Sequence, residues 1–114
     1  MNETKIFEYV LQTVNKEKLA EILTHHTLGG VTASDIEEHF HISRANASAY
    51  LNKLVTQKLL IKVDSRPVHF FPADLINLYV SDNSLQYTYT VDEFFKNVTS
   101  KQDVSAHSSA FDAL

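Results

Sequence analysis

The chain has 114 residues, which is enough for one domain of ordinary size with a short appendage. Hydrophobic residues make up 44% of the chain and charged residues 21%, so we expect a globular core. The absence of cysteine excludes a disulfide scaffold, a thiol nucleophile and a thiolate metal site. No apolar run approaches the roughly 20 residues of a membrane span, and residues 1–5 do not lead into a signal peptide. We therefore expect a cytoplasmic protein with no membrane partner.

The net charge of −4 hides an uneven distribution along the chain. Residues 1–40 carry a balance of −4, residues 41–72 one of +4 and residues 73–114 again −4. All of the excess positive charge therefore lies in one segment of 32 residues, which we call the basic block (residues 41–72). A local basic segment inside an acidic chain is typical of a surface that binds phosphates.

Apolar residues at three- and four-residue steps predict an amphipathic helix over residues 4–15 and a second helix over residues 16–24. We expect a break near Asn15, because the apolar stripe moves around the helix axis there; one continuous helix is the alternative. Gly29 and Gly30 are the only glycines, and we expect them to end the second helix through positive backbone angles.

Two further helices follow, each with its own start signal. Thr32 and Asp35 predict a capping box at the start of a short helix that ends at Phe40. Ser43 can cap a helix of four turns over residues 44–58. The link between the two helices is very short, which is typical of a helix-turn-helix.

The basic block ends in a predicted β-hairpin. Residues 59–63 and 68–72 are strand-like, and residues 64–67 form the turn between them. Helices followed by a hairpin are the order of a winged helix-turn-helix, whose second motif helix enters the major groove while the wing contacts the flanking backbone. The predicted fold class is mainly α with a small β-hairpin, and the predicted DNA-binding domain covers residues 1–72.

Residues 73–99 are predicted to form a short helical extension, with helices over residues 74–80 and 91–98 and an ambiguous segment over residues 81–90. Its aromatic rings either pack on the winged helix or form a self-association surface for a homodimer or higher homo-oligomer. Residues 100–114 are rich in Ser, Ala and Asp, which is typical of a linker.

The predicted contacts with double-stranded DNA come from the helix over residues 44–58 and from the hairpin. Small residues let a helix approach base edges closely, alanine can contact a thymine methyl, and asparagine can pair with adenine. The candidate base-facing residues, which would face bases or nearby phosphates, are Arg44, Ala45, Asn46, Ala49 and Lys53. The candidate backbone-facing residues are Ser43, Lys62 and Arg66. An ion pair between Arg66 and Asp64 is the alternative for Arg66.

Residues 42–48, 51–55, 58–62 and 66–68 resemble the N-terminal DNA-binding domain of the levanase-operon type of sigma-54-dependent bacterial transcription activators. The resemblance is close over residues 30–72, and residues 109–114 are similar to the stretch that these activators carry ahead of their ATPase module. Two positions depart from the family pattern: Ala49 stands where arginine is frequent, and Ser65 stands where glycine is frequent at the wing tip.

The resemblance implies an N-terminal fragment of a regulator that controls phosphotransferase-system sugar operons. Residues 100–114 would then lead to a missing ATPase module, and missing domains would contact sigma-54 RNA polymerase. The fragment itself is not expected to be an enzyme, because neither a nucleophile motif nor a phosphate-binding glycine loop is present. The six histidines lack the spacing of a metal site, and no cofactor is predicted. The alternative function is a winged-helix module for protein interaction or oligomerisation.

Overall fold

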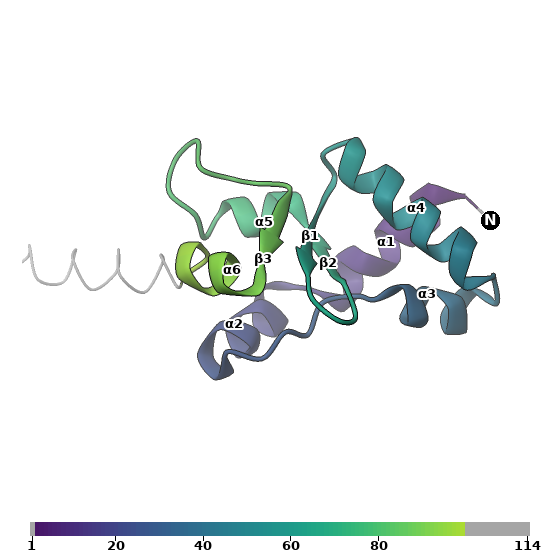
Figure 1. Ribbon diagram of the computed structural model, residues 1–114, viewed down its shortest axis with the longest axis horizontal. Helices are drawn as coiled ribbons and strands as arrows, with labels where there is room; N and C mark the ends of the chain where they lie inside the picture. Colours follow the sequence, from purple (N-terminus) through teal and green to yellow (C-terminus); the bar gives the residue numbers. More distant parts are fainter. Residues whose placement is uncertain (1, 100–114) are drawn as a thin grey trace, which may run out of the picture.

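The computed structural model describes residues 2–99 as four helices followed by strands and two short helices. Figure 1 shows the sheet in the middle, with α3 and α4 on one side and α2, α5 and α6 on the other. The fold is the predicted mainly α winged helix-turn-helix with a small sheet. The elements are α1 (Glu3–Thr13), α2 (Lys16–His25), α3 (Ala33–Phe40), α4 (Arg44–Thr56), β1 (Leu60–Asp64), β2 (His69–Pro72), α5 (Ala73–Asn77), β3 (Thr88–Thr90) and α6 (Val91–Asn97).

The predicted break near Asn15 is confirmed, and the alternative of one continuous helix is wrong. The Asn15 side chain caps α2 by accepting a hydrogen bond from the backbone N–H of Lys18 at 2.9 Å. Asn2 caps α1 in the same way, through the N–H of Lys5. Each helix therefore has its own N-terminal cap, which satisfies backbone donors that a helix leaves unpaired.

The predicted role of the glycines at the end of α2 is wrong. His26 ends α2 in the left-handed region, with φ at 52°, and neither glycine has a positive φ. Gly30 is instead required by close packing: a Cβ atom there would lie 2.8 Å from the carbonyl oxygen of Phe70 and 2.8 Å from the ring of Phe71. This approach lets Val31 pair with Phe70 in an isolated antiparallel bridge beside β2.

The helix-turn-helix forms largely as predicted. Thr32 Oγ1 accepts from the N–H of Asp35, and Asp35 Oδ2 accepts from the N–H of Thr32, so the capping box is present. Ser43 Oγ accepts from the N–H of Asn46 at 3.1 Å and caps α4. The α4 helix ends at Thr56 rather than at residue 58, and Lys58 turns the chain with φ at 65°.

The predicted hairpin is part of a three-stranded sheet with the order β2-β1-β3. β1 pairs antiparallel with β2, and each strand begins one residue later than predicted. β3 pairs parallel with β1, with Val63 opposite Tyr89. The third strand comes from the ambiguous segment over residues 81–90, in which only three residues form strand.

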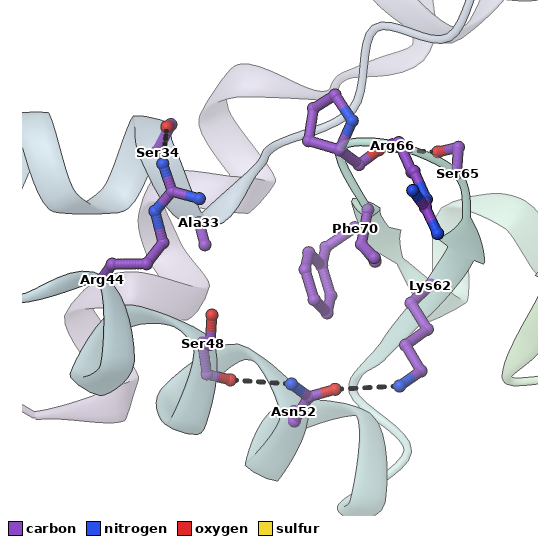
Figure 2. Close-up of a pocket in the computed structure, with 11 residues that line it drawn as sticks. Ala33, Ser34, Arg44, Ser48, Asn52, Lys62, Ser65, Arg66 and Phe70 are labelled. Carbon is purple, nitrogen blue, oxygen red and sulfur yellow. Dashed lines mark hydrogen bonds between the residues drawn. The ribbon is translucent and has the colours of Figure 1, made fainter.

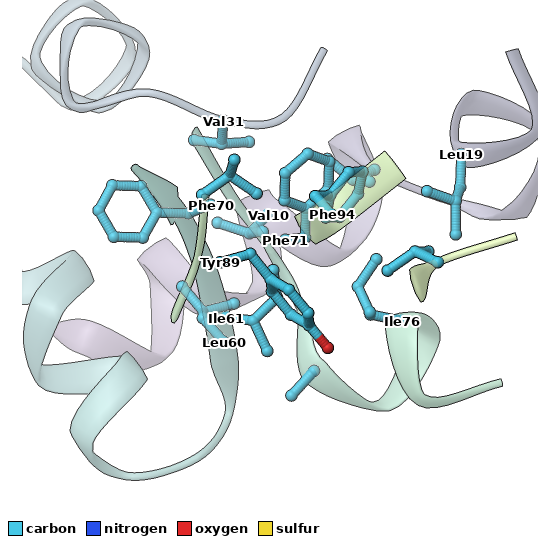
Figure 3. Packing of buried hydrophobic residues seen from close by; sticks show 14 of the residues in the cluster. Val10, Leu19, Val31, Leu60, Ile61, Phe70, Phe71, Ile76, Tyr89 and Phe94 are labelled. Atoms are coloured by element: carbon cyan, nitrogen blue, oxygen red, sulfur yellow. The ribbon is translucent and has the colours of Figure 1, made fainter. Parts of the chain in front are cut away.

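The extension and the winged helix share one hydrophobic core. Figure 3 shows Phe71, Tyr89 and Phe94 within it; the rings of Phe71 and Phe94 stack with centroids 4.9 Å apart. The Tyr89 hydroxyl accepts a hydrogen bond from the N–H of Gln86 at 2.9 Å, and burial raises the pKa of this hydroxyl. The core therefore continues from β2 into β3 and α6.

Replacing Gly30 with alanine should lower the free energy of unfolding by about 1–3 kcal/mol, because the added methyl group overlaps backbone and ring atoms that cannot easily move. Gly29→Ala is the matched control. Its Cβ would lie 3.1 Å from Lys18 Cε, the far part of a flexible side chain, so we expect a much smaller change. Urea unfolding followed by circular dichroism measures both variants. Equal stability losses would contradict the close-approach explanation.

Candidate nucleic-acid interface

A groove of about 310 Å³ lies between the helix-turn-helix and the wing, the turn that joins β1 to β2. We call it the wing groove. Figure 2 shows Arg44 on one side and Lys62 and Arg66 on the other, with Phe70 between them. Three cations line the groove, and none of the described residues lining it is acidic. A concave surface with this lining attracts anions.

The exposed face of α4 lies next to the wing groove. Ala47, Leu51 and Leu54 are buried against the core, so the opposite face of the helix is turned to solvent. The five candidate base-facing side chains are all exposed in the structure: Arg44, Ala45, Asn46, Ala49 and Lys53. Because two alanines lie among them, little side-chain bulk separates this part of the helix from a macromolecule that it contacts.

Ser43 lies at the point where the turn enters α4. Its hydroxyl oxygen caps the helix, and its own O–H donates to no partner among the described residues. The side chain can therefore donate a hydrogen bond while it continues to cap the helix. The free N–H groups and the positive end of the helix dipole add to the attraction for an anion at this position.

Arg44 is held by α3 in the structure. Its Nε–H donates to Glu37 Oε1 at 3.2 Å, and its Nη2 donates to Ser34 Oγ at 2.6 Å. The side chains remain accessible, with exposed fractions of 60% for Arg44 and 42% for Glu37. Two of the five guanidinium N–H groups are thereby used, and the other three have no partner among the described residues.

Lys53 also has a carboxylate partner. Its Nζ lies 3.3 Å from Oε1 of Glu3, at the start of α1. The second oxygen of this carboxylate, Oε2, is buried and has no hydrogen-bond partner among the described residues. Removing Lys53 from this pair would leave a half-buried carboxylate without its cation, which is unfavourable. Glu3 therefore holds Lys53 more firmly than the exposed Glu37 holds Arg44.

Lys62, in β1, connects the sheet to α4 through an amide rather than through a carboxylate. Its Nζ donates to Asn52 Oδ1 at 3.1 Å, and Asn52 Nδ2 donates to the backbone carbonyl of Ser48 at 3.0 Å. Figure 2 shows this chain of hydrogen bonds along one edge of the wing groove. Because the partner is neutral, Lys62 keeps its full positive charge at the groove.

The tip of the wing presents Arg66. An ion pair with Asp64 was the alternative role for Arg66, and the described residues do not form it. Ser65 donates from Oγ to the carbonyl of Pro67 at 2.7 Å, and this bond closes the turn without the glycine that is frequent in the levanase-operon type. Pro67 lies outside the strand ladder, where its missing N–H costs nothing.

The structure brings Arg44, Lys62 and Arg66 to one groove and places Ala49 and Lys53 on the adjoining face of α4. Sequence reasoning missed the side chains that hold these cations: Glu3, Ser34, Glu37 and Asn52. Glu3, at the start of α1, lies 50 residues from Lys53 in the sequence, so no local spacing indicates that these two residues pair. Glu37 and Arg44 are seven residues apart, but they belong to different helices on either side of the tight turn. Helical periodicity therefore does not predict their contact.

No cluster of three potential metal ligands is found within residues 2–99. None of the helices in this same part of the chain is both long and apolar enough to cross a membrane. The arrangement of cations, small side chains and a helix N-terminus has the chemistry of anion binding.

Comparison with known proteins agrees with this fold. Residues 19–69 match the family model described as MarR family. The match begins within α2 and ends at the first residue of β2, so it covers the helix-turn-helix, β1 and the wing. Comparisons with curated proteins and with solved structures give no match. The chain thus contains a winged helix-turn-helix domain similar to those of the MarR family, a fold of DNA-binding transcription regulators and not of enzymes.

Proposed function

We propose that the chain binds double-stranded DNA sequence-specifically, with α4 in the major groove and the wing on the flanking backbone. The observation that carries this proposal is the wing groove, whose described lining holds three cations and no acidic residue and which adjoins the exposed face of α4. The match of residues 19–69 to the MarR family points to the same class of function.

In this proposal the wing groove holds a stretch of sugar-phosphate backbone. Lys62 and Arg66 have no carboxylate partner among the described residues, so both can contact phosphates without first breaking an ion pair. Ser43 and the N-terminus of α4 bind a phosphate at the other end of the interface. These backbone contacts supply affinity and orient α4 over the bases.

Base recognition is assigned to the exposed face of α4. Asn46 can form two hydrogen bonds with adenine, and Ala45 and Ala49 can contact thymine methyl groups. Arg44 has three N–H groups available for a guanine or a phosphate. Lys53 keeps further N–H donors beside its contact with Glu3, but the carboxylate offsets its charge, which makes it the weakest of the proposed contacts.

We expect Asn46→Ala to reduce the preference for a selected duplex over a random duplex, because it removes a base contact and leaves the charge unchanged. Discrimination should fall by about 5–100-fold, and affinity for random DNA should change little. Arg66→Ala should instead weaken binding to both duplexes equally and reduce the salt slope by about 0.9. Fluorescence anisotropy at several salt concentrations measures both effects, with the selected duplex isolated from a random library by the chain itself.

The same titration tests the proposal as a whole. The wild-type chain should lose affinity linearly in log salt with a slope between about −2 and −4, the values for two to four neutralised phosphates. Absence of binding to any duplex at low salt would overturn DNA binding by this chain and favour a winged helix for protein interaction or oligomerisation. Equal losses on both duplexes with Asn46→Ala would exclude this residue as a base-reading contact.

A narrower hypothesis concerns the type of regulator. The resemblance over residues 30–72 supports a sigma-54-dependent activator of phosphotransferase-system sugar operons, with this chain as its N-terminal part. In that arrangement residues 1–72 bind DNA, residues 73–99 support this domain or self-associate, and residues 100–114 lead to an ATPase module. The linker lies outside the described residues. Homodimers would match two-fold symmetric DNA sites.

The narrower hypothesis predicts that the regulated promoter is silent in a strain that lacks sigma-54. A reporter fused to the promoter nearest to the selected DNA site measures this, with a promoter of the major sigma factor as the control. Unchanged reporter activity without sigma-54 would contradict this type of regulator and leave DNA binding itself untouched. Analytical ultracentrifugation of the chain, free and with the duplex, reports its oligomeric state.

A further inference from the structure

Glu37 is an acidic residue that lies against the proposed DNA interface. It belongs to α3, and it reaches across the turn of the helix-turn-helix to the first residue of α4, Arg44. Its neighbour Glu38 is exposed on the same helix and has no ion pair among the described residues. The two glutamates therefore have the same charge and are neighbours on α3, and they differ in their contact with Arg44.

The contact has two physical consequences for Arg44. The carboxylate neutralises most of the charge that the guanidinium would offer to any nearby phosphate. Together with Ser34, it also holds the guanidinium in one orientation, because the Nε and Nη2 groups are both engaged. Three N–H groups remain directed elsewhere and can pair with a base edge or a phosphate in a defined position.

We propose that Glu37 is a specificity-determining residue: it suppresses sequence-independent attraction through Arg44 and positions the guanidinium of Arg44 for a fixed acceptor in the correct site. This inference rests on the proposed function in DNA binding. Random DNA offers phosphates in positions that vary, so it gains nothing from a held guanidinium and is repelled by the carboxylate. The correct site is repelled as well, and the positioned arginine offsets that repulsion.

The solvent exposure of the ion pair between Glu37 and Arg44 is compatible with this role of Glu37. Because Glu37 is 42% exposed, water continues to solvate its carboxylate while Arg44 contacts DNA through its remaining N–H groups, so the pair does not have to break. The pair of Glu3 with Lys53 differs in this respect, since one oxygen of Glu3 is buried without a partner. Of the two ion pairs that the described residues make at the α4 face, the one at Arg44 leaves its cation three N–H groups for a DNA contact while the pair is intact.

The test compares Glu37→Gln with Glu38→Gln in the full 114-residue chain. Both variants remove one negative charge from α3, so they change the long-range field alike. Glu37→Gln should raise affinity for a random duplex by about two- to fivefold more than Glu38→Gln does, and it should steepen the salt slope on that duplex by up to about 0.9. Affinity for the selected duplex should rise less, so discrimination should fall in Glu37→Gln alone.

A double-mutant cycle with Arg44→Ala checks that the effect passes through this arginine. In the Arg44→Ala background, Glu37→Gln and Glu38→Gln should have the same effect on both duplexes. A larger effect of Glu37→Gln in that background would overturn the role assigned to Arg44. Thermal unfolding followed by circular dichroism verifies that each variant is folded, and all of the substitutions lie at exposed or half-buried positions.

The outcomes separate this inference from the proposed function. If the wild-type chain prefers the selected duplex, and Glu37→Gln and Glu38→Gln are indistinguishable on both duplexes, Glu37 has no specificity role while DNA binding stands. If neither the wild-type chain nor Glu37→Gln binds any duplex at low salt, DNA binding is overturned, and the role of Glu37 is overturned with it. If Glu37→Gln loses discrimination between the two duplexes and Glu38→Gln does not, the result supports both the DNA-binding function and the specificity role of Glu37.

Discussion

The burial of β1 on both faces is the constraint on which the rest of the structure depends. Leu60 and Ile61 are successive residues of this strand, so their side chains point to opposite faces of the sheet, and both are fully buried. β1 also has a hydrogen-bonded neighbour on each edge. A strand in this position must be covered on every side, which places α4 and the extension around it and fixes where the wing begins.

The position of the wing then follows from the strand pairing. The register of β1 and β2 places the turn next to α4, and the bond from Lys62 to Asn52 holds the two elements together. Close packing at Gly30 joins the segment before α3 to β2, so the helix-turn-helix and the wing are connected on two sides. The wing groove is the space that remains between them.

The electrostatics of the interface depend on contacts between segments of opposite charge. The basic block carries five cations, and two of them pair with glutamates of the acidic segment over residues 1–40. A third, Lys58, lies over the ring of Tyr87, at 5.8 Å from its centroid. The cations without a carboxylate or aromatic partner among the described residues are Lys62, in β1, and Arg66, in the turn that joins β1 to β2. The positive charge available to DNA is therefore smaller, and more localised, than a count along the chain indicates.

The sequence by itself determined the local elements, because their signals lie within a few residues. The capping box of Thr32 and Asp35 and the cap at Ser43 were predictable from side chains that bond to backbone groups three residues away. The break at Asn15 was predictable from the shift of the apolar stripe around the helix axis. The exposed face of α4 followed from helical periodicity. Tertiary structure alone decided the end of α2 at His26, the parallel pairing of β3 and the partners of Arg44 and Lys53. These features depend on which distant segments meet in space, and that is set by the burial of the whole apolar surface rather than by any local pattern.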